Sequence, residues 1–296
     1  MTIKHIVISG GGPSGFYAYG AAKYLEQQKF WNINNIETIY GTSIGAFVGV
    51  LLCLKYDWSV TDDYLIKRPW NKIFTFSADD LLKVWDEKGI LGIECAREAI
   101  KPLLDAKDLS IDITLKEFYE YTNIELHVFA VNLNDILLTE IDISYKTHAD
   151  MQLVKALAIT TAFPFVFKPV MEDDKCYIDG GLLMNFPIEP CLKSTGCDPN
   201  EILAFQNIWS IENKNSDKIN VNSSLLNYWS SIISAVIRKL NTKSSVVVPN
   251  TVNCLIESGG VDAWSSAIDN KESREMYVKK GETLGFMFYK YKTSSE

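Results

Sequence analysis

The stretch IETIYGTSIG, residues 36–45, predicts a strand that turns sharply into a helix. A strand over Ile36–Tyr40 precedes the GxSxG motif, and a run of small and aliphatic residues follows it. In such a turn the serine stands in a strained conformation, and the flanking Gly41 and Gly45 remove side chains that would clash. The motif alone is weak, because about one chain in ten of this length carries it by chance. Its context makes Ser43 a candidate nucleophile.

A second glycine-rich turn lies upstream, where GGGPSG (Gly10–Gly15) follows a strand and opens a helix. Such a loop presents unpaired backbone N–H groups beside the positive end of a helix, which suits an anion. One candidate anion is the oxyanion of a tetrahedral acyl intermediate, held by N–H groups of Gly11, Gly12 and Ile44. Both glycine loops would then meet at one edge of the sheet.

The same loop also fits the pyrophosphate of a flavin or nicotinamide dinucleotide, because GxGxxG with Pro13 is similar to that fingerprint. That interpretation needs an acidic residue about 20 residues on, at the end of the second strand. The GxSxG turn occupies this position, and Glu37 lies at the start of the strand instead. The oxyanion interpretation is favoured, and the dinucleotide interpretation remains as an alternative.

The motif Asp179-Gly180-Gly181 supplies a candidate general base. A strand-like Tyr177-Ile178 precedes it, and the two glycines let the backbone bend so that the carboxylate projects sideways. A hydrolase triad in the order serine, acid, histidine would need a histidine after the acid. None of the histidines follows Asp179; they are His5, His127 and His148. His127 lies in an apolar strand and is expected to have a structural role.

Strands and helices alternate along the chain, which predicts a largely parallel sheet with helices on both faces. We expect strands over Lys4–Ser9, Ile36–Tyr40, Glu125–Asn132, Leu137–Ile143, Val166–Met171, Ile202–Trp209 and Val252–Ile256. We expect helices over Gly15–Gln28, Ile44–Lys55, Thr61–Arg68, Ile93–Leu104, Leu115–Tyr121, Met151–Thr160, Leu225–Leu240 and Arg274–Tyr291. The one long polar loop is predicted at Glu212–Asn222. A single domain over residues 1–296 is the simplest organisation.

The composition excludes several classes of protein. With 47% hydrophobic and 22% charged residues, the 296-residue chain has enough apolar side chains for a large core. A net charge of −8 argues against a nucleic-acid partner held by bulk electrostatics. The longest apolar run, Ile44–Leu54, is too short to span a bilayer, and the six cysteines lack disulfide-framework or zinc spacing. We expect a cytoplasmic protein, with peripheral contact to membranes as an option, and no metal or cofactor.

Together the motifs resemble the patatin-like phospholipase family. The resemblance rests on the glycine-rich loop, the GxSxG motif, Thr160–Val170, the DGG motif and Asn185-Phe186-Pro187, and it extends over about residues 4–290. It implies a three-layer α/β/α sandwich with a mostly parallel central sheet. It also implies a Ser43–Asp179 catalytic dyad and oxyanion donors within Gly10–Gly12.

By that resemblance we expect a lipid acyl hydrolase, a phospholipase A-type esterase that acts on phospholipids or other acyl-ester lipids at a membrane or micelle surface. A catalytically silent lipid-binding protein of the same family is the alternative. Ser14 departs from the family, which usually has Arg or Lys there. The loss of this charge is expected to alter activity or head-group preference.

Two apolar segments are candidates for handling a lipid chain. The aromatic-rich Trp70–Trp85 is expected either to line or cap an apolar channel or to pack in the core. The amphipathic Leu225–Leu240 is expected to pack in the core, with an interfacial surface as the alternative.

Overall fold

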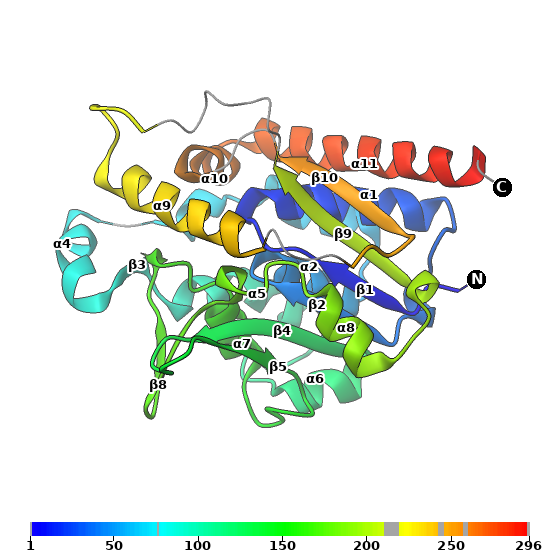
Figure 1. The fold of residues 1–296 in the computed structure, drawn as a ribbon, viewed down its shortest axis with the longest axis horizontal. Helices are drawn as coiled ribbons and strands as arrows, with labels where there is room; N and C mark the ends of the chain where they lie inside the picture. The colour runs from blue at the N-terminus through cyan, green and yellow to red at the C-terminus, as the bar shows by residue number, and fades with distance from the viewer. Residues whose placement is uncertain (1, 76, 210–218, 242–245, 257–259, 295–296) are drawn as a thin grey trace.

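A central eight-stranded sheet organises the computed structural model, which describes residues 2–75, 77–209, 219–241, 246–256 and 260–294 (Figure 1). Its strands run in the order β10-β9-β1-β2-β4-β8-β7, and β5 pairs with β4. Their bounds are β1 His5–Ile8, β2 Thr38–Thr42, β4 Glu125–Asn132, β5 Thr139–Ile143, β7 Val170–Glu172, β8 Lys175–Asp179, β9 Ile202–Trp209 and β10 Thr251–Ile256. A separate parallel pair consists of β3 (Gly89–Leu91) and β6 (Phe165–Phe167).

The sheet is parallel from β10 through β9, β1 and β2 to β4, as the alternation of strands and helices predicts. The strands β5, β8 and β7 extend it in antiparallel fashion beyond β4. Parallel neighbours need crossover helices, and these helices cover both faces of the sheet. The expected mixed α/β architecture with a mostly parallel sheet is confirmed.

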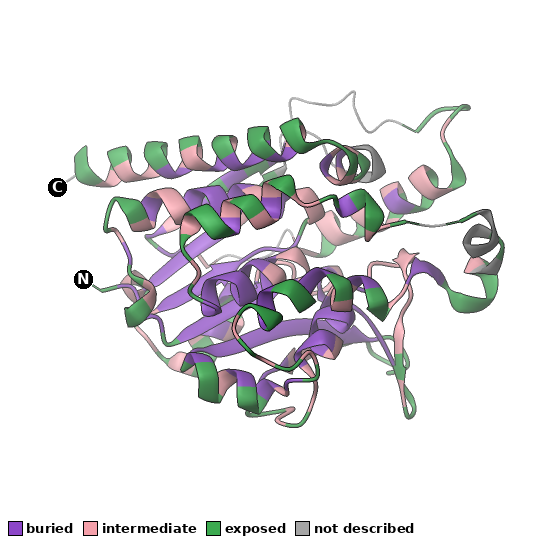
Figure 2. Ribbon diagram, turned by 180° about the vertical axis from the view of Figure 1, so that it is seen from behind, coloured by how far each residue is buried: buried purple, intermediate pink, exposed green. Residues whose placement is uncertain are grey.

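Helices form the two outer layers. Their bounds are α1 Gly15–Gln27, α2 Ile44–Cys53, α3 Trp58–Asp62, α4 Ala78–Glu87, α5 Ile93–Asp105, α6 Leu115–Thr122, α7 Leu153–Thr160, α8 Ile188–Thr195, α9 Leu225–Leu240, α10 Gly260–Asp269 and α11 Lys271–Ser294. Side chains of β1 alternate between the layers: Ile6 and Ile8 join the large core with α1, α2, α5 and α7, whereas Val7 joins a smaller core beneath α8. Figure 2 shows the buried strands behind the helices of the larger layer. The result is the expected three-layer sandwich.

Two predicted elements are wrong in detail. The predicted strand Val166–Met171 is divided into β6 and β7, which belong to different sheets. Pro169 lies between them, and a proline cannot donate to a ladder. The predicted helix Thr61–Arg68 consists of the end of α3 and a π-helical turn over Asp63–Lys67. The helices α4, α8 and α10 were not expected, because each is a short amphipathic segment between loops.

Most of the predicted loop Glu212–Asn222 lies outside the described residues. The organisation of residues 1–296 as a single domain stays a prediction.

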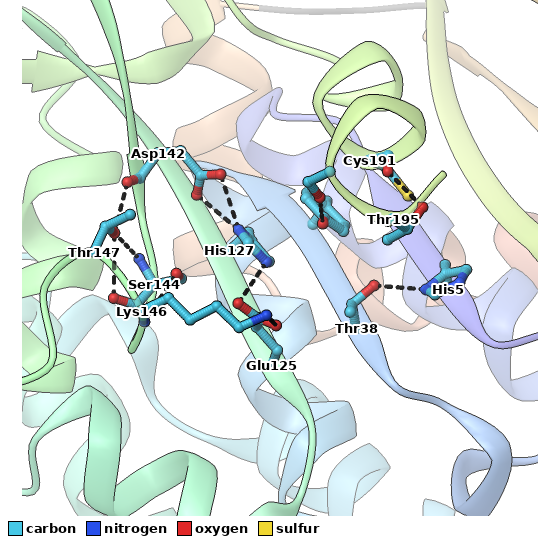
Figure 3. Close-up of polar contacts among 12 residues, drawn as sticks. His5, Thr38, Glu125, His127, Asp142, Ser144, Lys146, Thr147, Cys191 and Thr195 are labelled. Atoms are coloured by element: carbon cyan, nitrogen blue, oxygen red, sulfur yellow. Dashed lines mark hydrogen bonds and ion pairs between the residues drawn. The ribbon is translucent and has the colours of Figure 1, made fainter. Parts of the chain in front are cut away.

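The face of the sheet beneath α8 carries a buried polar network around His127 of β4 (Figure 3). Its Nδ1 lies 2.8 Å from Asp142 Oδ1 on β5, and its Nε2 lies 3.2 Å from Glu125 Oε1. Lys146 Nζ donates to Glu125 Oε2 at 2.7 Å, and the imidazole stacks on Tyr40 with ring centroids 4.1 Å apart. The sequence expectation of a structural histidine is confirmed.

This network shifts two pKa values in opposite directions. Burial lowers the pKa of His127, but hydrogen bonds with Asp142 and Glu125 outweigh burial and hold it above its usual 6.5. Burial raises the pKa of Glu125, but hydrogen bonds with His127 and Lys146 hold it below its usual 4.5. At pH values between the two pKa values, the network with ionised Glu125 and protonated His127 is therefore favoured.

We predict that the loss of unfolding free energy caused by His127→Gln is larger at about pH 5.5 than at about pH 8.5. The two losses should differ by about 1 kcal/mol. A histidine whose pKa is raised on folding contributes stability that is present below 6.5 and lost as the pH rises through the folded-state pKa. Urea unfolding of both proteins at the two pH values measures the difference. Equal destabilisation at both pH values would show that the imidazole is neutral throughout.

Candidate active site

Ser43 occupies a strained turn between β2 and α2, as the GxSxG motif predicts. Its φ of 53° and ψ of −124° lie in a region that side chains other than glycine rarely adopt. The turn passes close to β1, since a Cβ on Gly45 would lie 2.4 Å from the Ile8 carbonyl oxygen. Helix α2 begins at Ile44, whose N–H is one of the unpaired donors at a helix N-terminus. The turn therefore holds a serine side chain beside free N–H groups.

Asp179 reaches Ser43 because β2 and β8 share one edge of β4. The end of β2, Thr42, lies opposite Phe129, and the end of β8, Asp179, lies opposite the next residue, Ala130. The other edge of β4 is occupied by β5 over this stretch. The parallel and antiparallel strands thus meet with their carboxyl ends together. A glycine is required after Asp179, since a Cβ on Gly180 would lie 2.2 Å from the Phe129 carbonyl oxygen.

The carboxylate of Asp179 is buried, with 5% of the residue exposed. Burial raises its pKa from 3.8 to about 6, although the Gly181 N–H and the Ser43 side chain both hydrogen-bond to it and oppose the rise. The Gly181 N–H lies 2.7 Å from Oδ1. Asp179 is therefore mostly ionised at neutral pH, yet a better proton acceptor than an ordinary aspartate.

Thr160, at the end of α7, holds the serine turn in place. Its hydroxyl donates to the Phe129 carbonyl oxygen at 2.6 Å and accepts the Ser43 N–H at 2.9 Å. From the sequence, Thr160 was placed within a motif but had no assigned role. A pair of threonines at the end of an apolar helix was the available signal.

The glycine loop is fixed by two asparagines, one on β9 and one in the segment before α8. Asn207 Nδ2 on β9 donates to the Gly10 carbonyl oxygen at 2.6 Å, and Asn185 Nδ2 approaches the same oxygen at 3.4 Å. In a trans peptide the following N–H points opposite to the carbonyl, so Gly11 N–H faces away from Asn207. The expectation that Gly10 is also a donor is corrected, because its N–H donates to the Asn185 carbonyl oxygen at 3.0 Å.

Ser14 takes part in the same network. Its hydroxyl donates to the Gly11 carbonyl oxygen at 3.1 Å and accepts from Asn207 Nδ2 at 2.6 Å. The residue is buried, and its neutral hydroxyl fixes the second peptide of the loop. Asn207 was missed by the sequence analysis, and the only signal was a polar pair, Gln206 and Asn207, in an apolar strand.

All five segments that carry the family resemblance contribute residues to the wall of one cavity of about 650 Å³. The predicted residues on its wall are Gly10, Gly11, Gly12, Ser43, Ile44, Asp179 and Gly181. Aromatic and aliphatic side chains form much of the remaining wall, among them Phe47, Trp70, Phe74, Val166, Phe167 and Trp264. None of the three histidines lines it. The arrangement can combine a nucleophile, a buried base and backbone donors beside an apolar chamber.

The two segments proposed for lipid contact behave differently. Trp70 and Phe74 line the cavity, whereas Leu82 and Trp85 are 76% and 77% exposed. Among the described residues of Trp70–Trp85, the first part of the segment therefore forms the wall. The preferred expectation that Leu225–Leu240 packs in the core is wrong, because Ser230 is the only residue of α9 that is buried.

No site for a metal lies at this cavity among the described residues. His5, Cys197 and Glu201 bring possible ligand atoms within 4.8 Å of one another, but they do not line the cavity. Glu201 is already paired with Lys4 at 2.7 Å. Among the described residues, no helix is both long and apolar enough to cross a bilayer.

Comparison with known proteins agrees with this geometry. Residues 6–192, more than half of the chain, match the family model described as patatin-like phospholipase. The chain belongs to the patatin-like phospholipase family. The structure is also similar to VipD from Legionella pneumophila, with a TM-score of 0.54 and 15% identity over 97% of this chain and 67% of VipD. That similarity supports the fold alone.

Two viral relatives are similar in sequence. The chain is 30% identical over 192 residues to the probable lipid hydrolase 463L of Invertebrate iridescent virus 6. The match covers 64% of this chain and 63% of that protein. It is 26% identical over 186 residues to the uncharacterized protein R571 of Acanthamoeba polyphaga mimivirus. This match covers 63% of this chain and 60% of that protein. The matched region thus spans under two thirds of either relative.

We predict that Asp179→Asn increases the free energy of unfolding at pH 7 by up to about 3 kcal/mol, since one pKa unit corresponds to about 1.4 kcal/mol. An acid whose pKa rises on folding from 3.8 to about 6 destabilises the fold when ionised. This cost is absent below about pH 3.8 and complete above about pH 6. The stability gained by Asp179→Asn should therefore vanish in acid. Urea unfolding across this range measures it, with exposed Asp150→Asn as the control. A variant less stable than wild type at pH 7 would contradict the prediction.

Proposed function

We propose that the protein is a lipid acyl hydrolase of the phospholipase A type, with Ser43 as nucleophile and Asp179 as general base. The observation that carries the proposal is the meeting of Ser43, buried Asp179 and the glycine loop on the wall of one apolar cavity. Membership of the patatin-like phospholipase family supports it, and so does the name of the iridescent-virus relative.

In the proposed reaction Asp179 accepts the proton of Ser43 while the serine oxygen attacks the ester carbonyl. The N–H groups of Gly11, Gly12 and Ile44 stabilise the oxyanion that develops on the carbonyl oxygen. The protonated Asp179 then gives its proton to the departing alcohol. Water, deprotonated by Asp179, releases the acyl chain from Ser43 as a carboxylic acid.

A carboxylate with a pKa of about 6 is a weak base for a serine hydroxyl. Much of the rate enhancement must therefore come from the fixed backbone donors, each worth about 3–4 kcal/mol of transition-state stabilisation. The orientation of the Gly11 and Gly12 N–H groups depends on the hydrogen bonds that Asn207 and Ser14 make to the loop carbonyls.

The substrate we propose is an acyl-ester lipid, with a phospholipid as the first candidate. An apolar cavity of about 650 Å³ is large enough for an acyl chain, whose burial there is favourable by about 0.8 kcal/mol per CH₂ group. The main alternative is a lipid-binding protein of the same family that has lost catalysis. A dinucleotide-binding oxidoreductase is the less favoured one, because Ser43 follows β2 where its ribose-binding acid would lie.

Ser43→Ala should abolish ester hydrolysis and labelling by a fluorophosphonate, since both need the serine oxygen to form a covalent bond. The control is Ser234→Ala, which removes another hydroxyl from the cavity wall and should retain both activities. Labelling is read by mass spectrometry of the modified peptide. A wild-type protein that neither labels nor hydrolyses esters would support the silent lipid-binding alternative. Labelling that persists in Ser43→Ala would refute the nucleophile assignment.

Asn207→Asp should lower kcat by about 100-fold and leave KM nearly unchanged. The substitution keeps the shape but places a carboxylate oxygen against the Gly10 carbonyl, so the first peptide of the loop loses its orientation. Affinity for a trifluoromethyl ketone, which forms an oxyanion on Ser43, should fall by a similar factor.

Asn253→Asp, the same change at an exposed position of neighbouring β10, is the control for Asn207→Asp. Both variants are compared with wild type by steady-state kinetics and inhibitor affinity. A raised KM with unchanged kcat would place Asn207 in substrate binding rather than in orienting the loop.

A further inference from the structure

The helix α9 presents a stripe of apolar side chains to solvent. We define the α9 stripe as Leu225, Trp229, Ile232, Val236 and Leu240. Between 37% and 58% of each of these residues is exposed, and they recur at intervals of three and four residues along one side of the helix. An exposed apolar stripe of this length on a protein surface indicates contact with another apolar phase or partner.

The stripe borders the cavity that contains Ser43. An adjacent face of α9 supplies Leu226, Ser230, Ser234 and Ile237 to the cavity wall. The same helix therefore separates the cavity from solvent and carries apolar side chains toward both. Figure 1 shows α9 at the end of the molecule that also holds α4, β3 and α10. A lipid chain that enters beside α9 would pass from the α9 stripe to the apolar wall of the cavity without crossing a polar surface.

The charge of α9 differs from that of the whole protein. The helix contains no acidic residue, and its last turn carries Arg238 and Lys239. The whole chain has a net charge of −8. A helix with an aromatic and aliphatic stripe and basic residues beside it has the composition of helices that lie in the plane of a lipid interface. Charge complementarity therefore favours a surface that includes anionic lipid head groups.

We propose that the α9 stripe docks on a lipid surface containing anionic head groups and places the mouth of the cavity against it. The proposal rests on the proposed function, because it assigns the source of the lipid substrate. With 16 residues α9 is about 24 Å long, so it lies along the surface and does not span the bilayer.

The neighbouring helix α4 is not part of the proposed surface. It exposes Leu82 and Trp85 at the same end of the molecule, but its sequence ADDLLKVWDE contains four acidic residues. These charges oppose an anionic surface.

Vesicle co-sedimentation tests the proposal in a Ser43→Ala background, so that lipid turnover does not alter the vesicles. The vesicles are phosphatidylcholine alone or phosphatidylcholine mixed with phosphatidylserine. The protein should bind the mixed vesicles more tightly, and added salt should weaken this binding. Val236→Asp should reduce it by about tenfold, and Ile232→Asp with Val236→Asp by more, since both side chains lose apolar contact and gain charge repulsion.

Met287→Asp is the matched control, because it places the same charge at another exposed apolar position, on the half of α11 nearer the C-terminus. It should bind vesicles like the parent protein. In the catalytically intact background, Val236→Asp should hydrolyse a soluble short-chain ester at the wild-type rate, because Val236 does not line the cavity. The same variant should lose hydrolysis of vesicle lipid.

Three outcomes would overturn the docking proposal: no vesicle binding by the parent protein, equal binding by Val236→Asp, or equal loss with Met287→Asp. Self-association that Val236→Asp abolishes, without vesicle binding, would assign the stripe to a contact between copies of the chain. These results differ from a failure of the proposed function, in which no ester is hydrolysed in a Ser43-dependent way while vesicle binding can still occur.

Discussion

The candidate site depends on one edge of a single strand, β4. At Phe129 this edge pairs with the end of the parallel strand β2. At Ala130 it pairs with the end of the antiparallel strand β8. The Phe129 carbonyl oxygen also receives the hydroxyl of Thr160 and lies against Gly180. Because a sheet ladder fixes the register of its strands, Ser43 and Asp179 are placed by main-chain hydrogen bonds, and no flexible side chain sets their separation.

This placement has an energetic consequence. The junction of two strand ends lies beneath helices, so the carboxylate of Asp179 is buried with few hydrogen-bond donors around it. The ionised form is then disfavoured, which raises the pKa and costs folding stability. The same burial makes the carboxylate more basic and less hydrated. Reactivity and local instability therefore have one physical cause.

The groups that orient the glycine loop are neutral. Asn207 and Asn185 orient the glycine loop through their amide groups, and Ser14 does so through its hydroxyl. Ser14 is the one of these three that stands where the family usually has Arg or Lys. Such a network directs N–H groups without adding a charge to the cavity. Lys168 also lines the cavity and pairs with Glu87, and further positive charge lies at the end of α9, beside the apolar stripe. In the proposed function the chemistry of the ester and the attraction to the lipid surface are thus separated in space.

The sequence alone determined the elements that depend on local patterns. The strand before Ser43, the helix after it and the glycine turns are recognisable because alternation, helix periodicity and glycine content act over a few residues. His127 was recognised as structural for the same reason, since it lies within an apolar strand. The motif order was sufficient to identify the family.

Tertiary structure decided everything that joins distant segments. The division of Val166–Met171 between two sheets, the use of the Gly10 N–H by Asn185 and the role of Asn207 all depend on contacts between residues far apart in sequence. The amphipathic pattern of α9 was visible, but the residues of the α9 stripe are exposed where core packing was expected. Periodicity shows that a helix has an apolar face, and only the packing of the other elements decides whether protein or solvent meets that face.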